Sequence, residues 1–311
     1  MQIIEKSFEP LQTELPDALR NPPRVPYVAF KAMARANLAK MRAGMGGNSK
    51  DIVGQPVSTR QHVIEGHAGP VTVRIYAPEA KATASRPLLV YFHGGGWFGG
   101  TMEAVEAFCQ AVADQADAVV VNVGYHLCPE HPYPHGLEDC YRATLWAAGD
   151  PDLGIDQNKV AVGGDSAGGN LAAAVSLMAR DRGAPAINKQ LLIYPAVTLH
   201  DFVSPTGERG GAFGRLLTDW YLAGATKTTD PYVSPILAPT LAGLPAALVA
   251  VCETDGLKEQ GVAYAQKLAD AGVEARCLLY KGADHAFIDN TGTQPAANDL
   301  AEESARFLRG L

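Results

Sequence analysis

Short apolar segments alternate with helix-like segments along most of this chain, and the alternation restricts its fold more than any other feature. Each apolar segment is brief and rich in β-branched residues, as strands are when helices cover both faces of a sheet. Because the first of them alternates apolar and polar residues, we predict that it is an antiparallel edge strand. The predicted strands are residues 71–76, 88–92, 118–123, 160–163, 191–194, 247–251 and 275–280.

Helical patterns follow most of these strands. They fit residues 105–114, 137–148, 170–180, 262–271 and 299–308, and Gly272 follows the fourth of them as a C-cap glycine. Strands that alternate with helices predict an α/β fold with a mostly parallel central sheet and helices on both faces. A chain of 311 residues with 47% hydrophobic residues is sufficient to bury the core of such a domain.

One strand–helix junction places a serine between glycines, in the sequence Gly164-Asp165-Ser166-Ala167-Gly168. A turn this sharp tolerates only small flanking residues, and it leaves the serine hydroxyl exposed at the edge of the sheet. The pentapeptide is typical of a nucleophile elbow, but a Gly- and Ala-rich chain can also produce it by chance. Its interpretation therefore depends on partner residues elsewhere in the chain.

A serine hydroxyl is a weak nucleophile and needs a base that is itself held by a carboxylate. Asp255 and His285 follow the ends of the last two predicted strands, at the sheet edge where open α/β sheets bind ligands. The order of Ser166, Asp255 and His285 is that of a doubly wound hydrolase. Glu253 and Asp284 are rival carboxylates, and the sequence alone does not exclude Glu253.

Acyl transfer also requires N–H donors for the oxyanion of the tetrahedral intermediate. Ala167 offers one, at the start of a helix where N–H groups lack internal partners. A glycine run, Gly94, Gly95 and Gly96, directly follows the predicted strand 88–92 and lets the backbone approach a substrate closely. A plain turn would use the same residues, whereas the spacing of nucleotide-binding glycine motifs is absent. We predict donors in this run and leave open which two glycines supply them.

Two regions interrupt the strand–helix alternation. The first, residues 1–61, contains a helical pattern at 27–41, and the second, about 195–244, is too long for an ordinary connection. Apolar residues in the second recur at helical spacing, and this stripe fits either a helix packed on the core or a lid over the site. The stripe consists of Phe213, Leu216, Leu217, Trp220 and Tyr221.

With these residues in place, the chain resembles the hormone-sensitive-lipase-like esterases, the bacterial family IV branch of the α/β-hydrolases. The resemblance runs from about residue 87 to the C-terminus. It rests on the segments His93 to Trp97, Tyr125 to Pro134, Leu137 to Tyr141, Gly164 to Asn170, Asp255 to Leu257 and Gly282 to Phe287. The chain departs from the family where Gly256 stands in place of the usual proline, and where His126 and Cys128 replace the commoner arginine and alanine. These departures bear on substrate range more than on the reaction.

The resemblance implies the α/β-hydrolase fold with a helical cap, and it assigns the roles of the site. Ser166 is the implied nucleophile, His285 the general base and acid, and Asp255 its orienting carboxylate, with Ala167 and the 94–96 loop as the oxyanion hole. We therefore expect an N-terminal cap region at 1–61 and a catalytic domain at 62–311 that carries a second cap segment at about 195–244. Trp97 and the apolar stripe are the candidate pocket and cap residues.

The implied reaction is hydrolysis of short- to medium-chain acyl esters through an acyl-enzyme intermediate, without a cofactor. An amidase or lactonase would use the same triad, since these enzymes differ in leaving-group protonation and pocket shape. A non-catalytic small-molecule receptor on the same fold is a further alternative, which the retained His285 disfavours. A small-molecule ester is the expected partner, and a homodimer is left open.

Composition excludes several other classes of protein. A net charge of −7 without a Lys/Arg cluster argues against a nucleic-acid partner. Because the chain has neither a signal-like start nor an apolar run of membrane-spanning length, we expect a cytoplasmic protein without stable membrane insertion. The five cysteines form no C-x-x-C pair, which indicates free thiols in a reducing compartment.

A metal site is the remaining interpretation of the loop before the second helix. His126, His131 and His135 lie close together in the sequence, but no acidic ligand is suitably spaced, and we predict no metal. Cys128 in the same loop is interpreted as a packed thiol rather than a nucleophile.

Overall fold

A nine-stranded sheet forms the centre of the computed structural model, which describes residues 1–9, 26–80, 85–200, 211–224 and 227–310. The strand order is β1-β9-β8-β7-β6-β4-β5-β3-β2. The strands are β1 (Ile3–Ser7), β2 (Val57–Glu65), β3 (Pro70–Pro78), β4 (Arg86–Phe92), β5 (Val119–Gly124), β6 (Ile155–Asp165), β7 (Lys189–Ile193), β8 (Ala246–Cys252) and β9 (Ala275–Lys281). Only β3 is antiparallel to both of its neighbours, β2 and β5, and every other pair is parallel.

The predicted strands are all confirmed, but the sequence missed the two strands at the edges of the sheet. The first predicted strand, β3, is antiparallel as expected, yet its edge position is wrong because β2 covers it. Most residues of β2 are exposed, so this strand carries little of the apolar pattern that identified the others. At the opposite edge, β1 pairs in parallel with β9 from Ile3 to Ser7.

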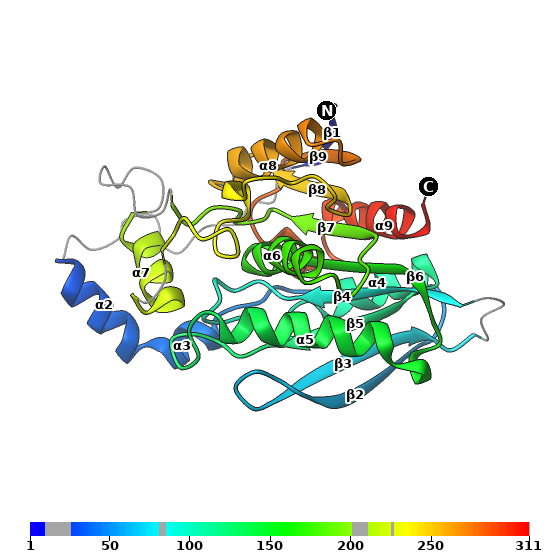
Figure 1. Cartoon of the computed structure of the whole chain (residues 1–311), viewed down its shortest axis with the longest axis horizontal. Coiled ribbons are helices and arrows are strands. Elements are labelled where there is room, and N and C mark those ends of the chain that lie inside the picture. Colours follow the sequence, from blue (N-terminus) through cyan, green and yellow to red (C-terminus); the bar gives the residue numbers. More distant parts are fainter. Residues whose placement is uncertain (10–25, 81–84, 201–210, 225–226, 311) are drawn as a thin grey trace.

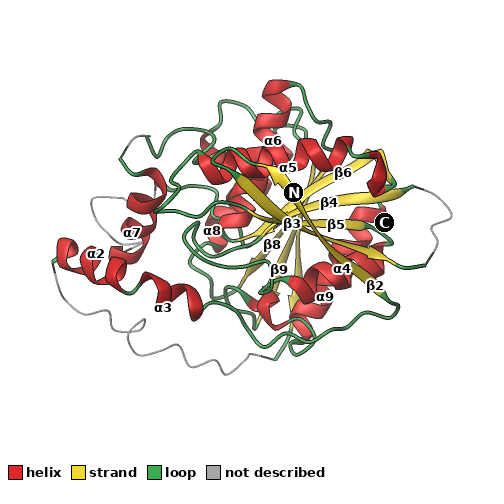
Figure 2. Ribbon diagram, turned by 90° about the horizontal axis from the view of Figure 1, so that it is seen from below, coloured by secondary structure: helices red, strands yellow, loops and turns green. Residues whose placement is uncertain are grey.

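Helices cover both faces of the sheet, as Figures 1 and 2 show. They are α2 (Tyr27–Ala36), α3 (Leu38–Ala43), α4 (Glu106–Ala116), α5 (His135–Gly149), α6 (Ala167–Arg182), α7 (Gly211–Leu222), α8 (Lys258–Asp270) and α9 (Pro295–Arg309). Residues of α5, α6 and α8 pack in one apolar cluster, and those of α4 and α9 pack in the other. Adjacent residues of β4 alternate between the two, since Leu88 and Val90 join the first and Leu89 and Tyr91 the second.

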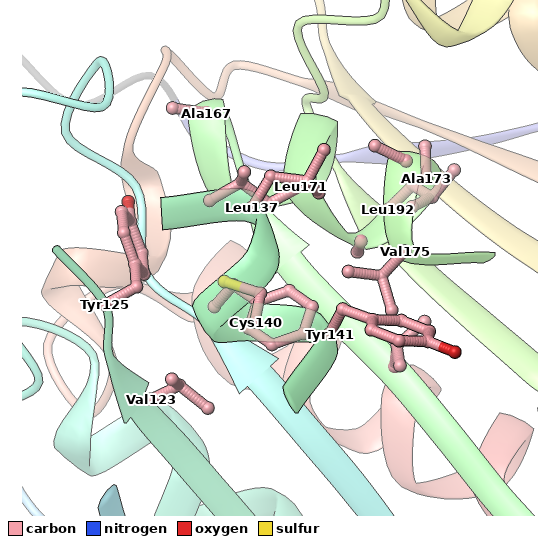
Figure 3. Packing of buried hydrophobic residues seen from close by; sticks show 14 of the residues in the cluster. Val123, Tyr125, Leu137, Cys140, Tyr141, Ala167, Leu171, Ala173, Val175 and Leu192 are labelled. Carbon is pink, nitrogen blue, oxygen red and sulfur yellow. The ribbon is translucent and has the colours of Figure 1, made fainter. Parts of the chain in front are cut away.

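The first cluster holds the helix that begins at the predicted elbow. Figure 3 shows Leu137, Cys140 and Tyr141 of α5 beside Leu171 and Val175 of α6. All thirteen residues from Ala167 to Ala179 are buried, and α6 packs against both the sheet and the neighbouring helix α5. A helix enclosed in this way fixes the position of its N-terminus, where the predicted nucleophile lies.

The helical pattern at residues 27–41 forms two helices rather than one. The break lies at Asn37, whose side-chain amide donates to the carbonyl oxygen of Met33 at 2.8 Å. Asparagine forms such local hydrogen bonds to the backbone in competition with the regular helix. The other predicted helices and the left-handed Gly272 after α8 are confirmed.

Helices α2, α3 and α7 gather at one end of the molecule (Figures 1 and 2). Asp219 of α7 joins two of them, because its carboxylate accepts hydrogen bonds from the Tyr27 hydroxyl at 2.7 Å and from the Lys31 ammonium at 3.1 Å. Two parts of the region expected as an N-terminal cap lie elsewhere, since β1 and residues 57–61 of β2 belong to the sheet. No helix in the described ranges has both the length and the apolar character needed to cross a membrane.

Candidate active site

Ser166 lies in a strained turn between β6 and α6. Its φ of 54° and ψ of −114° are unfavourable for a side chain with a Cβ atom, and such a conformation costs about 1–3 kcal/mol. The flanking glycines make the turn sterically feasible. A Cβ atom on Gly168 would lie 1.9 Å from the carbonyl oxygen of Phe92, and one on Gly164 would lie 2.5 Å from the backbone of Gly168. The predicted nucleophile elbow is therefore present in the fold.

Three loops bring Ser166, His285 and Asp255 into a continuous chain of hydrogen bonds. His285 Nε2 lies 2.8 Å from Ser166 Oγ, and His285 Nδ1 lies 2.7 Å from Asp255 Oδ2. Asp255 is held in turn, because its other oxygen accepts the N–H of Leu257 at 2.8 Å. With the Nδ1 proton directed at Asp255, the Nε2 lone pair of neutral His285 faces the serine hydroxyl.

The two rival carboxylates make other contacts. Glu253 accepts the backbone N–H of Gly282 at 3.1 Å, and Asp284 accepts a hydrogen bond from the Thr254 hydroxyl. Both contacts join the loops that follow β8 and β9. Glu253 and Asp284 therefore brace the loops that carry the triad, while Asp255 contacts the imidazole.

The electrostatic surroundings favour a more basic histidine. Burial lowers the pKa of His285, but the hydrogen bond that it donates to Asp255 and the charges of Asp255 and Asp165 raise it, and the net pKa lies above the ordinary 6.5. The imidazole still reaches solvent through the cavity, with 38% of the side chain exposed, whereas Asp255 is only 4% exposed. This arrangement stabilises the imidazolium that forms when the serine loses its proton.

The glycine run lies beside Ser166, and its N–H groups differ in their hydrogen bonding. The N–H of Gly94 donates to Asp165 Oδ1 at 2.9 Å, so it is already engaged. In the part of the chain that the structure describes, no such acceptor is found for the N–H groups of Gly95, Gly96 or Ala167. All of these residues line the same cavity as Ser166. We therefore propose Gly95, Gly96 and Ala167 as oxyanion donors, with Gly94 as the anchor of the loop.

Asp165 supports the loop from beneath, a role that the sequence analysis missed. Besides Gly94, the Tyr91 hydroxyl donates to the same carboxylate oxygen at 3.0 Å, and only 3% of Asp165 is exposed. Burial raises the pKa of this carboxyl against the opposing effect of its two donors. The sequence signal that could have indicated this role is the position of Asp165 in the elbow pentapeptide, next to Ser166.

His93, at the start of the same loop, has an uncharged imidazole. Burial lowers the pKa of His93 to about 4, and its Nδ1 lies 2.8 Å from the Gly94 carbonyl oxygen. The ring stacks on Tyr125 with centroids 4.5 Å apart, and the Tyr125 hydroxyl donates to the His93 carbonyl oxygen at 2.8 Å. His93 and Tyr125 therefore position the loop rather than contribute a charge.

We predict that Gly95→Ala lowers kcat for p-nitrophenyl butyrate by about 10²- to 10³-fold, the usual loss for one oxyanion donor. Gly95 has φ +117°, and a Cβ atom would lie 2.2 Å from the carbonyl oxygen of Gly99, so the loop must move. Gly69→Ala is the matched control, because Gly69 also has a positive φ, of 133°, but no atom within 4 Å of the added Cβ. Equal losses in both variants, measured by steady-state kinetics, would contradict the proposed role of the loop.

A cavity of about 520 Å³ lies over the triad. Most of its lining is apolar, and Trp97, Phe213 and Leu217 among the predicted pocket residues contribute to it. The other members of the α7 stripe face inward: Leu216, Trp220 and Tyr221 are each less than 5% exposed and belong to the core. Both interpretations of the stripe therefore apply to α7, because some of its apolar residues pack on the core and others form part of the cavity wall.

Arg42 of α3 attaches the N-terminal helices to the catalytic loops, and the sequence gave no sign of it. Its guanidinium donates to the carbonyl oxygens of Phe98 at 2.6 Å and Cys128 at 3.0 Å, and it pairs with Glu130 at 2.6 Å. One side chain therefore links the cap to both the oxyanion loop and the loop that precedes α5.

The histidine-rich loop is organised around the carboxylate of Asp139. Asp139 accepts the N–H groups of His67 at 2.6 Å and His126 at 3.0 Å, and His126 Nδ1 lies 2.6 Å from it. The His131 ring lies tilted against His126 at 4.5 Å between centroids and edge-on to His135 at 5.9 Å. Among the described residues, no group of three or more histidine, cysteine or acidic side chains is arranged to hold a metal ion. Cys128 is buried and unpaired.

Known proteins share both the sequence and the fold of this chain. Residues 89–289, more than half of the chain, match a family model described as the alpha/beta hydrolase fold. The curated esterase LipI of Mycobacterium tuberculosis is 37% identical over 278 residues, which cover 84% of this chain and 85% of LipI. An arylesterase of Saccharolobus solfataricus is 35% identical and covers 78% of this chain and 80% of its own length.

A solved structure agrees with these relatives. The hyperthermophilic esterase of the archaeon Pyrobaculum calidifontis superposes with a TM-score of 0.76 and 32% identity, covering 93% of both chains. The chain therefore belongs to the α/β-hydrolase family, in the hormone-sensitive-lipase-like branch that its motifs resemble.

Proposed function

We propose that this chain is a serine carboxylesterase that hydrolyses short- to medium-chain acyl esters. The observation that carries the proposal is the unbroken series of contacts from Ser166 through His285 to Asp255, at 2.8 Å and 2.7 Å. The names of its relatives, an esterase and an arylesterase among them, support the same chemistry. The retained His285 favours an enzyme over a receptor that only binds its ligand.

The reaction proceeds in two acyl-transfer steps. Ser166 Oγ attacks the ester carbonyl carbon while His285 takes the hydroxyl proton, and Gly95, Gly96 and Ala167 stabilise the oxyanion. The intermediate collapses, the C–O bond to the alcohol breaks, and His285 gives its proton to the leaving oxygen. A water molecule then attacks the acyl-enzyme with His285 again as base, which releases the acid and restores Ser166.

We expect the chain-length preference to follow the size of the cavity. In a panel of p-nitrophenyl esters, the butyrate and hexanoate should give the highest kcat/KM, and the dodecanoate should be at least about tenfold poorer because pocket fit sets such discrimination. The cavity of about 520 Å³ matches a small ligand rather than a long lipid chain. A maximum at the dodecanoate would contradict the proposed substrate class.

The pH profile should lose activity on the acid side. Only neutral His285 can accept the serine proton, and its pKa lies above 6.5, so log kcat/KM should fall with unit slope below a midpoint higher than 6.5. His93 cannot produce this limb, because its pKa is near 4. Full activity one pH unit below the ordinary imidazole pKa of about 6.5 would rule out His285 as the base.

The same triad could act on amides or lactones, and the leaving group separates these activities. An ester preference predicts rapid release of p-nitrophenol from the butyrate ester and little release from butyryl p-nitroanilide. Comparable rates with the two would favour an amidase, which must protonate a far more basic leaving group.

The cap and the cellular location complete the proposal. We propose that the helices of residues 27–43 and the insertion at about 195–244 form one cap, which the contacts of Asp219 with Tyr27 and Lys31 support. We propose a cytoplasmic location, supported by all five cysteines being buried and free, as expected in a reducing compartment.

A further inference from the structure

Asp289 is a carboxylic acid in the wall of the catalytic cavity that the triad does not use. It lies in the short 3₁₀ turn Phe287–Asn290, four positions after His285, and it lines the same cavity as Ser166. In the described part of the chain its carboxyl oxygens make no hydrogen bond or ion pair, and the residue is half-buried. By contrast, Asp165 and Asp255 each have two hydrogen bonds.

A glycine packs against the backbone of Asp289, and other small residues line the same cavity. A Cβ atom on Gly47 would lie 2.3 Å from the Asp289 carbonyl oxygen and 2.8 Å from its Cβ atom, so only glycine fits there. Gly46 and Ala104 line the same cavity, and a Cβ atom on Gly46 would lie 3.9 Å from that of Ala104. The loop before β2 therefore closes tightly on the backbone of Asp289 and leaves its side chain on the cavity wall.

The position of Asp289 after His285 in the same loop suggests which part of the substrate it contacts, namely the alcohol part. His285 Nε2 must reach the leaving oxygen to protonate it, so the alcohol leaves on the side of the cavity next to the imidazole. Asp289 interacts electrostatically with His285 and follows it in the same loop. The acyl group stays bound covalently to Ser166 after the alcohol has left, so the binding of the acyl chain does not depend on this side of the cavity.

We propose that Asp289 is a specificity-determining residue that hydrogen-bonds a hydroxyl group on the alcohol part of the substrate, so that the enzyme prefers esters of diols and polyols. This inference rests on the proposed esterase function. A polar group in a cavity wall that matches a substrate hydroxyl discriminates against the analogue without it, because the group then loses that hydrogen bond. Burial and the nearby charge of Asp165 raise the pKa of Asp289, whereas the charge of His285 lowers it, and the carboxyl accepts a hydrogen bond from a substrate hydroxyl in either protonation state.

The test compares 2-hydroxyethyl butyrate with propyl butyrate, which differ only by a hydroxyl in place of a methyl group. Release of butyrate gives kcat/KM for each ester. The quantity compared between variants is kcat/KM for 2-hydroxyethyl butyrate divided by kcat/KM for propyl butyrate. The intrinsic reactivities of the two esters are the same for every variant and cancel in this comparison. Asp289→Leu should lower the ratio about fivefold, the usual effect of one neutral hydrogen bond. Asp289→Asn keeps a donor and an acceptor, and its ratio should stay within about twofold of wild type.

Thr101→Val is the matched control, since Thr101 is another polar residue of the same cavity. Its ratio should equal that of the wild type, whereas a fall confined to Thr101→Val would overturn the assignment of Asp289. An unchanged ratio in Asp289→Leu also overturns the assignment of Asp289. If the leucine variant does not fold, Asp289→Ala replaces it in the same measurement, with the same expected fall in the ratio. If the wild type hydrolyses neither ester nor p-nitrophenyl butyrate, the esterase function itself fails, and this inference fails with it.

Discussion

Ser166→Ala should reduce kcat for p-nitrophenyl butyrate by about 10⁵- to 10⁶-fold, the loss observed when a triad nucleophile is removed. The physical reason is that Oγ is the attacking atom, and no other hydroxyl is shown within hydrogen-bond reach of His285 Nε2 among the described residues. Discontinuous assays of p-nitrophenol release with milligram quantities of the variant can measure such a residual rate. Activity within about tenfold of the wild type would exclude the acyl-enzyme route that we propose.

The control variant for this experiment is Ser176→Ala in the same helix. Ser176 is buried, lies ten positions after Ser166 in the sequence, and donates to the Ala172 carbonyl oxygen at 2.9 Å. It should keep kcat within about twofold of wild type, because its hydrogen bond is local and far from the reacting atoms. Thermal unfolding should show that both variants are folded. Alanine keeps the Cβ atom of Ser166 and therefore the same backbone strain, so Ser166→Ala should be about as stable as the wild type.

Asp255→Asn should lower kcat by about 10⁴-fold, because an amide that donates to Nδ1 forces the imidazole into the wrong tautomer. The Nε2 atom then carries the proton and cannot accept the one on Ser166 Oγ, although the distance of 2.8 Å between them is kept. The substitution also removes the negative charge that raises the pKa of His285. Any residual activity should therefore have its acid limb at lower pH than in the wild type.

Glu253→Gln and Asp284→Asn complete this comparison, since the sequence presented both as rivals of Asp255. Glu253 accepts a backbone N–H from Gly282, and the imidazole Nδ1 is bonded to Asp255 instead, so a glutamine oxygen can replace the role of Glu253. Both variants should lose less than about tenfold in kcat, the scale of a displaced loop rather than a lost triad member. A 10⁴-fold loss in Glu253→Gln with an active Asp255→Asn would reverse the assignment.

The parallel sheet and the triad were predictable because both depend on local patterns and chain order. Buried parallel strands have nearly continuous apolar runs, and their carboxyl ends meet at one edge of the sheet. Ser166, Asp255 and His285 follow three such ends, so their convergence is a consequence of the strand order. The edge strands were missed for the same reason, since β2 is exposed and lacks an apolar run.

Other assignments required the tertiary structure because they depend on which atom faces which neighbour. The sequence named Gly94, Gly95 and Gly96 alike, and only the packing of Asp165 against the loop shows that the Gly94 N–H is engaged. The α7 stripe gave two interpretations because helical spacing shows that one side is apolar but not what it contacts.

The residues of this chain thus determined, by themselves, a parallel sheet and the loops that bear a nucleophile, a base and a carboxylate. They did so because strand periodicity and turn sterics act over a few neighbouring residues. The tertiary structure alone decided the engaged and unengaged N–H groups, the face of α7 that lines the cavity, and the place of Asp289 beside His285. The first two depend on contacts between segments far apart in the chain, and the place of Asp289 depends on which elements surround the cavity, so no local pattern encodes their geometry.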